Sequence, residues 1–225
     1  MPDADSSRAV GVKPAYWDEA TRSLGKRDRV LRKLIRAYPG IHLARRSDPF
    51  TTLARAIVGQ QISVKAADSI WRRFVATVAP EAGSAAFPKL GPRGVAGAGL
   101  PALRVCGLSQ RKAEYLRDLS RHFVSGALDP GGWKKLDDEA LIAALVEVKG
   151  IGRWTAEMFL IFHELRADVF PVDDIGVQRA VALHYNGGER MALAALRDVA
   201  LAWRPYRSVA TWYLWRSLDP VPVEY

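Results

Sequence analysis

The chain has 225 residues, of which 49% are apolar and 25% charged, a composition typical of globular proteins and not of disordered ones. Lys and Arg outnumber Asp and Glu by 33 to 24, and the resulting net charge of +9 favours a polyanionic partner, either nucleic acid or an anionic membrane surface. The only cysteine, Cys106, excludes an internal disulfide and an all-cysteine zinc or iron–sulfur site, and it fits a reducing, intracellular setting.

The sequence offers little for a membrane. Its start carries acidic residues where a secretory signal peptide needs positive charge followed by an apolar run. No stretch approaches the ~18 uninterrupted apolar residues of a membrane-spanning helix. We therefore expect nucleic acid as the partner and no membrane.

Along the chain, polar residues 1–15 lack periodicity and predict a flexible tail. From there apolar residues recur at helical spacing almost throughout, and the period-two alternation of strands is rare, so the predicted fold class is all-α. Helices are expected over 30–35, over 50–58, from Ser63, from Ser109, from Asp137, and from about 153, 175, 190 and 206. Residues 80–101, rich in Gly, Pro and Ala, predict a long surface connection.

Two of these helical patterns flank the short turn Lys149-Gly150-Ile151-Gly152-Arg153. Both glycines can adopt positive φ, and they leave backbone amides unshielded at the start of the next helix, where a phosphate oxygen binds well. Lys149 and Arg153 add positive charge. The turn therefore predicts a phosphate-binding hairpin, and a tight helix–helix corner without a ligand is the alternative.

This turn, taken with the block 168–174 (Asp-Val-Phe-Pro-Val-Asp-Asp), resembles the helix–hairpin–helix DNA glycosylase superfamily, and within it the 3-methyladenine DNA glycosylase II (AlkA-type) branch. Blocks 56–63 and 203–208 add to the resemblance, which spans roughly residues 48–218. It implies a two-lobed helical fold with the active-site cleft between the lobes. Residues 16–225 would form the glycosylase domain, with the helix–hairpin–helix at about 138–164 and no N-terminal α/β domain.

The resemblance implies base-excision repair chemistry on damaged double-stranded DNA. An alkylated purine of the 3-methyladenine or 7-methylguanine type is flipped out, and hydrolysis of its N-glycosidic bond leaves an abasic site. Asp174 matches the family's catalytic carboxylate, which stabilises positive charge on the sugar and orients or deprotonates the attacking water. The alternative is that Asp173 or Asp174 only caps the helix near Ile175. The two roles are compatible, with Asp173 as the candidate cap.

Three residues are expected to form the base pocket: Trp154, Met158 and Trp215. Relatives that also cut the DNA backbone have a lysine at the position of Trp154, where it forms a Schiff base with the sugar. Tryptophan cannot do so, and the resemblance therefore implies a glycosylase without lyase activity. The π face of Trp154 suits a cationic base. Met158 departs from the aromatic residue common in the branch, whereas Trp203, Trp212 and Tyr213 are expected in the core.

Gln60 and Gln61 lie in a turn that the family uses to fill the gap left by a flipped base, with Gln61 at the wedge position. A polar corner between helices is the alternative. In the family the hairpin carbonyls hold a monovalent cation, which here implies Na⁺ or K⁺ on the carbonyls of Val146, Val148 and Ile151. No other cofactor is expected.

The four histidines lack metal-ligand spacing, and the basic residues of 26–36 receive no specific role, because a solvated helix face explains them. Two alternative functions stay open: a glycosylase for other damaged or deaminated bases, and a non-catalytic module that binds DNA or abasic sites. Asp174 and the pocket tryptophans weigh against the module. We expect a monomer that is not secreted, located in the cytoplasm of a bacterium or the nucleus of a eukaryote.

Overall fold

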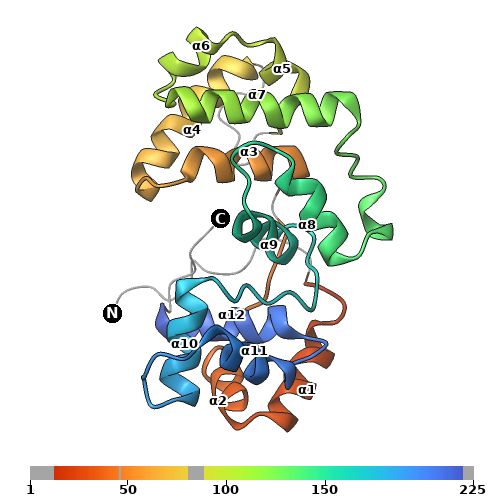
Figure 1. Cartoon of the computed structure of the whole chain (residues 1–225), viewed down its shortest axis with the longest axis vertical. Coiled ribbons are helices and arrows are strands. Elements are labelled where there is room, and N and C mark those ends of the chain that lie inside the picture. Colours follow the sequence, from red (N-terminus) through yellow and green to blue (C-terminus); the bar gives the residue numbers. More distant parts are fainter. Residues whose placement is uncertain (1–12, 46, 81–88, 220–225) are drawn as a thin grey trace. The chain divides into compact units, whose positions relative to one another are not determined.

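The computed structural model describes residues 13–45, 47–80 and 89–219. Every regular element within these residues is a helix, which confirms the all-α prediction. The chain divides into two compact units, one made of residues 13–45 and 160–219 and the other of residues 47–159 (Figure 1). Most of the predicted tail and part of the predicted surface connection, residues 1–12 and 81–88, lie outside the described residues.

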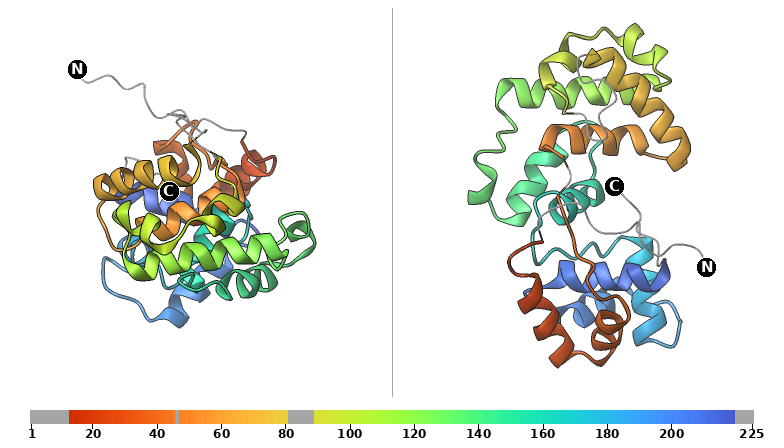
Figure 2. Two further views of the ribbon diagram at one scale, coloured as in Figure 1. Left: turned by 90° about the horizontal axis from the view of Figure 1, so that it is seen from above. Right: turned by 180° about the vertical axis from the view of Figure 1, so that it is seen from behind.

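The first unit contains five helices in its described part, α1 (Trp17–Arg27), α2 (Arg29–Ala37), α10 (Ile175–Tyr185), α11 (Leu193–Leu201) and α12 (Arg207–Leu218) (Figure 2). Helix α12 packs against α1, α2 and α10, and most of its residues are buried. Trp203, Trp212 and Tyr213 are all buried, as the core interpretation predicted. The unit is therefore built around one central helix that carries several aromatic rings.

The second unit contains α3 (Pro49–Gly59), α4 (Val64–Val78), α5 (Pro92–Gly97), α6 (Leu100–Val105), α7 (Gln110–Ser125), a short 3₁₀ helix (Trp133–Lys135), α8 (Asp138–Val146) and most of α9 (Arg153–Phe162). Helix α7 packs against α3, α5 and α6. A chain of edge-to-face rings, Phe50, Phe123, Trp133 and Phe159, joins the start of α3 to α9. Such contacts favour a fixed arrangement of the helices that carry them.

Three predicted helix starts agree with the structure because each depends on one local side chain. Ser63, Ser109 and Asp137 each accept a backbone amide hydrogen bond at the start of their helices, as N-cap residues do. One start is wrong: α11 begins at Leu193, after residue 190. No helix in the described part of the chain is long and apolar enough to cross a membrane.

The predicted connection over residues 80–101 is only partly a connection. Two short helices, α5 and α6, begin within it, and each has a proline in its first turn, a position where proline costs no hydrogen bond. Val95 and Leu103 on these helices are fully buried. The glycines and prolines were interpreted as loop signals, whereas the prolines here start helices.

Candidate active site and nucleic-acid interface

The candidate catalytic carboxylate, Asp174, is the N-cap of α10. Its Oδ1 accepts the amide hydrogen of Val177 at 2.7 Å. The backbone of Asp174 is extended, with φ −72° and ψ 120°, so the side chain can turn back to the first turn of the helix. The expectation that Asp173 is the cap is therefore wrong, because the chain enters the helix one residue later.

A second donor holds the same oxygen. The indole Nε1 of Trp215, on α12, donates to Oδ1 of Asp174 at 2.9 Å. The Trp215 ring also stacks on Phe162, with centroids 5.6 Å apart and planes inclined by 12°. The structure therefore brings together Asp174 and Trp215, two residues singled out in the sequence, and gives Trp215 a contact with the carboxylate that the sequence did not predict.

The close approach of Trp215 to Asp174 depends on Gly176. A Cβ at this position would lie 3.0 Å from Oδ1 of Asp174 and 3.2 Å from Cδ1 of Trp215. Few real Cβ atoms come so close to a neighbour, so a larger residue would displace one of the two side chains. Sequence reasoning missed Gly176, although a glycine two residues after the candidate catalytic aspartate was a signal that could have found it.

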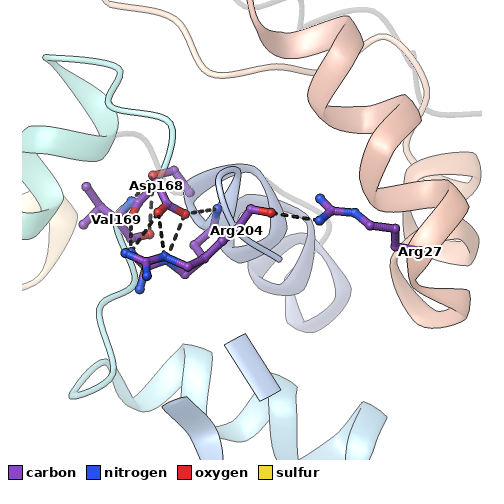
Figure 3. A network of polar contacts seen from close by, with 6 residues as sticks. Arg27, Asp168, Val169 and Arg204 are labelled. Carbon is purple, nitrogen blue, oxygen red and sulfur yellow. Dashed lines mark hydrogen bonds and ion pairs between the residues drawn. The ribbon is translucent and has the colours of Figure 1, made fainter. Parts of the chain in front are cut away.

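The segment that leads to Asp174 is attached to the start of α12 by an ion-pair network (Figure 3). Asp168 accepts hydrogen bonds from Arg207 Nε at 2.8 Å and Nη2 at 2.9 Å, and from Arg204 Nε at 3.2 Å. The carbonyl of Arg204 in turn accepts from Arg27 at 2.9 Å. Burial of Asp168 by itself would raise its pKa, but the arginine donors outweigh burial, and the pKa of Asp168 lies below its ordinary value.

In the other unit, the hairpin between α8 and α9 depends on one glycine. Gly150 has a φ of +86°, and a Cβ there would lie 2.2 Å from the ring of Tyr115. Gly152 has no positive φ, and a Cβ on it would meet nothing within 4 Å. Of the two glycines expected to allow positive φ, only Gly150 uses it.

The hairpin amides differ in what they can offer a phosphate. The Lys149 amide donates to Oδ2 of the buried Asp118 at 2.9 Å. The Ile151 amide donates to the carbonyl of Val148 within the hairpin. Within the described residues, the amides of Gly150 and Gly152 donate no hydrogen bond. These two amides are therefore the candidates for phosphate contact, and phosphate binding stays a prediction.

Arg153 makes a contact that the sequence did not predict. Its guanidinium pairs with Glu139 of α8, at 2.9 Å for Nη1, and with the buried Glu157 of α9 at 3.0 Å. The hydrogen bonds to Glu139 raise the pKa of Arg153 above its ordinary value, and the same contact lowers the pKa of Glu139. Arg153 thus joins the two hairpin helices, and two carboxylates offset its charge. Its expected phosphate contact also stays a prediction.

The two glutamines of the turn after α3 have different surroundings. Gln60 Nε2 donates to the carbonyl of Gly150 at 2.8 Å and ties this turn to the hairpin. Lys112 Nζ donates to the carbonyls of Val58 at 2.8 Å and Gln60 at 2.6 Å, and burial lowers the pKa of Lys112. Gln61 is exposed and has a φ of +58°. Of the two expected wedge residues, Gln61 is the one whose side chain is exposed.

The expected pocket residues do not all have the same exposure. Trp154, in the first turn of α9, is 39% exposed, whereas Met158, one turn later, is 6% exposed. Both belong to the unit of residues 47–159, and Asp174 and Trp215 belong to the other. The structure brings together residues within each unit, and a base pocket made of Trp154, Met158 and Trp215 stays a prediction.

The carbonyls expected to hold a cation are neutral oxygen donors, the type that hard cations prefer. The Val148 carbonyl accepts the Ile151 amide hydrogen at 3.0 Å, which leaves a lone pair, because a carbonyl oxygen has two. Val146 is exposed at the end of α8. Neutral donors of this kind are compatible with a monovalent ion, whose binding stays a prediction. In the described part of the chain, His, Cys, Asp and Glu form no cluster of three that could hold a metal.

Comparison with known proteins places the hairpin and the aspartate in one family. Residues 54–204 match the HhH-GPD superfamily of base excision DNA repair proteins. The chain belongs to this superfamily. The matched range contains the turn after α3, the hairpin between α8 and α9, and Asp174.

Relatives in the superfamily agree with this assignment. The chain is 32% identical to DNA-3-methyladenine glycosylase 1 of Schizosaccharomyces pombe, over 82% of this chain and 79% of that protein. A DNA-3-methyladenine glycosidase from Bacillus halodurans superimposes with a TM-score of 0.80 at 34% identity, covering 89% of each chain. A S. pombe 3-methyladenine DNA glycosylase in complex with abasic DNA superimposes with a TM-score of 0.76 at 27% identity, covering 92% of this chain and 98% of that one. The chain spans 59% to 79% of the length of the first curated relatives that it matches.

Proposed function

We propose that the protein is a DNA glycosylase that removes alkylated purines of the 3-methyladenine and 7-methylguanine type from double-stranded DNA by hydrolysis of the N-glycosidic bond. The observation that carries the proposal is the carboxylate of Asp174, held at the start of α10 by two N–H donors. Several curated and solved relatives bear the name of 3-methyladenine glycosylases, and one solved structure is a complex with abasic DNA.

Asp174 supplies the chemistry that this reaction needs. An alkylated purine already carries positive charge and leaves readily, whereas the sugar gains positive charge as the bond breaks. A carboxylate beside C1′ stabilises that charge, and it can orient or deprotonate the water that attacks. Because the Val177 amide and the Trp215 indole both bind Oδ1, the orientation of the carboxylate is set before DNA binds.

We further propose that the enzyme has no lyase activity. A lyase needs an amine that attacks the sugar and forms a Schiff base. Trp154 stands at the position where lyases of the superfamily have lysine, and it has no such amine. The expected product is an abasic site in an intact strand.

For the interface, we propose that the hairpin binds DNA phosphate through the amides of Gly150 and Gly152 and the charge of Lys149. A Na⁺ or K⁺ ion on the carbonyls of Val146, Val148 and Ile151 would add positive charge for phosphate there. We propose no further cofactor. We also propose a monomer located in the cytoplasm of a bacterium or the nucleus of a eukaryote.

The test is base release from methylated duplex DNA, with 3-methyladenine and 7-methylguanine resolved and strand breaks scored without added alkali. We expect base release with intact strands. Asp174→Asn is the matched variant, because the amide oxygen of Asn can still accept hydrogen bonds from Val177 and Trp215 while the charge is lost. Base release by this variant should fall on the order of 10³-fold, the scale of electrostatic transition-state stabilisation, at unchanged DNA affinity.

The results separate the alternatives. DNA binding without base release would support the non-catalytic module. Release of other damaged or deaminated bases, with alkylated purines left in place, would support the related glycosylase. Unchanged base release by Asp174→Asn would overturn the role of Asp174.

A further inference from the structure

Apart from Arg27, which donates to the carbonyl of Arg204, the cations of a basic segment of α1 and α2 have no part in the site described above. Residues 22–36 contain seven Lys and Arg and a single acidic residue, Asp28, so the segment carries a net charge of +6 out of +9 for the whole chain. The seven, here called the basic face, are Arg22, Lys26, Arg27, Arg29, Arg32, Lys33 and Arg36. Such concentration of one sign of charge creates a local field that attracts polyanions.

The one acidic side chain of the segment is occupied with the fold. Oδ1 of Asp28 accepts the amides of Val30 and Leu31 at 2.8 and 3.0 Å, as the N-cap of α2. Its Oδ2 accepts the Tyr185 hydroxyl at 2.8 Å and the Trp203 indole at 3.0 Å. Asp28 therefore binds donors from the interior of the unit and pairs with no cation of the basic face.

All seven cations of the basic face are exposed. Within the described residues, none of them forms an ion pair with a carboxylate. Elsewhere in the chain Arg55, Arg153 and Arg207 each pair with a carboxylate. The positive charge of the basic face is thus available to a partner.

Four of these cations converge on one groove. A groove of about 500 Å³ runs between α1 and α2, and Arg22, Lys26, Arg32 and Arg36 line it together with Thr21, Gly25 and Ile35. The helices approach closely at Gly25, where a Cβ would lie 4.0 Å from Ile35. Arg32 is fixed in position because it donates to the carbonyls of Gly25 at 2.5 Å and Lys26 at 3.1 Å. Arg22 is held as well, because its Nε donates to the carbonyl of Asp18 at 3.2 Å. Two held cations beside Lys26 and Arg36 along one groove suit a chain of phosphates.

The burial of the apolar residues of the two helices argues against binding to a membrane surface. A helix that binds a bilayer surface exposes large apolar side chains beside its cations. Here the large apolar residues Trp17, Leu24, Leu31 and Leu34 are buried, and no large hydrophobic residue of the described segment 13–45 is among the exposed ones. The basic face therefore fits a polyanion such as a nucleic acid better than a lipid bilayer.

We propose that the basic face of α1 and α2 is a second nucleic-acid contact, which binds the phosphate backbone of duplex DNA regardless of sequence or damage. This inference rests on the proposed function only in taking DNA as the polyanion. The contact adds binding to undamaged DNA, so an enzyme that searches for rare lesions stays longer on the duplex.

The test compares two double variants of the full chain. Lys26→Gln with Arg36→Gln removes two groove cations whose side chains form no hydrogen bond within the described residues. Arg190→Gln with Arg197→Gln removes the same charge from exposed positions of the same unit that neighbour Glu189 and Asp198. Thermal unfolding verifies that both variants fold. The dissociation constant for an undamaged duplex is measured by fluorescence anisotropy from 50 to 200 mM KCl.

We expect the groove variant to bind undamaged DNA with a salt dependence that is less steep by about 1.8 in log K against log salt, because each phosphate contact contributes about 0.9. Over this salt range the wild type would lose about tenfold more affinity than the variant. The control pair should keep the slope of the wild type. An unchanged slope for the groove variant, or an equal change in both variants, overturns the proposal.

The choice of undamaged DNA and a parallel measurement on vesicles keep the proposals apart. The slope is measured on undamaged DNA, so a wild type that releases no base refutes the proposed function and leaves the salt test intact. Binding to vesicles of phosphatidylcholine and phosphatidylserine is measured in parallel. If the groove variant loses affinity for the vesicles and not for DNA, the basic face is a membrane contact and the inference is overturned.

Discussion

The contact between Trp215 and Asp174 leads to the sharpest prediction. Trp215→Phe removes the indole N–H that donates to Oδ1 of Asp174 at 2.9 Å and keeps an aromatic ring against Phe162. A hydrogen bond to a charged group contributes about 1.5–3 kcal/mol, which corresponds to roughly 10- to 100-fold in rate. The Val177 amide still holds the same oxygen at 2.7 Å, so we expect a loss near the lower end, about tenfold.

The assay is single-turnover base release from methylated duplex DNA, at enzyme concentrations that saturate the duplex. Under these conditions the rate reports the chemical step and not DNA affinity. The dissociation constant for DNA is measured separately and should change little, because the substitution removes no charge.

Trp212→Phe is the matched control. Trp212 lies one turn before Trp215 on α12 and packs edge-to-face on the same Phe162, with centroids 6.0 Å apart. Its indole nitrogen is buried, and within the described residues it has no hydrogen-bond partner. This variant loses the same atoms without a contact to the carboxylate, so its rate should stay close to that of the wild type. A Trp215→Phe rate within twofold of the wild type, or an equal loss in both variants, would refute the reasoning.

Three further predictions concern the fold around the candidate site. Gly150→Ala should lower the free energy of unfolding by about 2 kcal/mol or more, because it adds a Cβ at positive φ against an aromatic ring. Gly152→Ala should change the free energy of unfolding little, and chemical denaturation measures both variants. Gln60→Ala should lower the free energy of unfolding by about 1 kcal/mol, because it loses the hydrogen bond to the hairpin. Gln61→Ala should leave the free energy of unfolding unchanged and slow base release from duplex DNA. Equal stabilities of the two variants would contradict these separate roles. Asp168 has a pKa below its ordinary value, so it stabilises the fold above about pH 4 and loses this contribution as the pH falls through its folded pKa. The stability of Asp168→Asn should therefore fall less on acidification than that of the wild type. Thermal melts from pH 7 to pH 3 measure this difference.

Features that depend on nearby residues were predicted from the sequence. An N-cap such as Ser109 binds an amide three residues later, and the residue type alone indicates it. Asp174 was chosen as the candidate catalytic residue because its block follows the hairpin in the order typical of the family, and its role stays a prediction. The sequence could not decide between Asp173 and Asp174 as the cap, because both are aspartates and only the point at which the backbone turns helical separates them.

Features that depend on distant residues were not predicted. Gln60 and Gln61 have the same side chain and differ only in their backbone position. Gln60 binds the hairpin, whereas Gln61, at positive φ, is exposed. Gly150 is required by Tyr115, which is 35 residues earlier in the chain. Arg153 was assigned to phosphate by its charge, but Glu139 lies within reach across the hairpin. In each case the signal is a pairing that one sequence by itself does not reveal.

Helix α12 holds the segment that carries the candidate catalytic aspartate, Asp174, at two points. Near its start, Arg207 binds Asp168, and two turns later Trp215 binds Asp174. Eight residues of helix separate the two attachments, a rise of about 12 Å, and the helix is largely buried and therefore stiff. Loss of the first attachment leaves Trp215 in place, so we expect Asp168→Asn to act mainly on stability. Loss of the second leaves the segment anchored but frees the carboxylate, which is why Trp215→Phe should act on the chemical step.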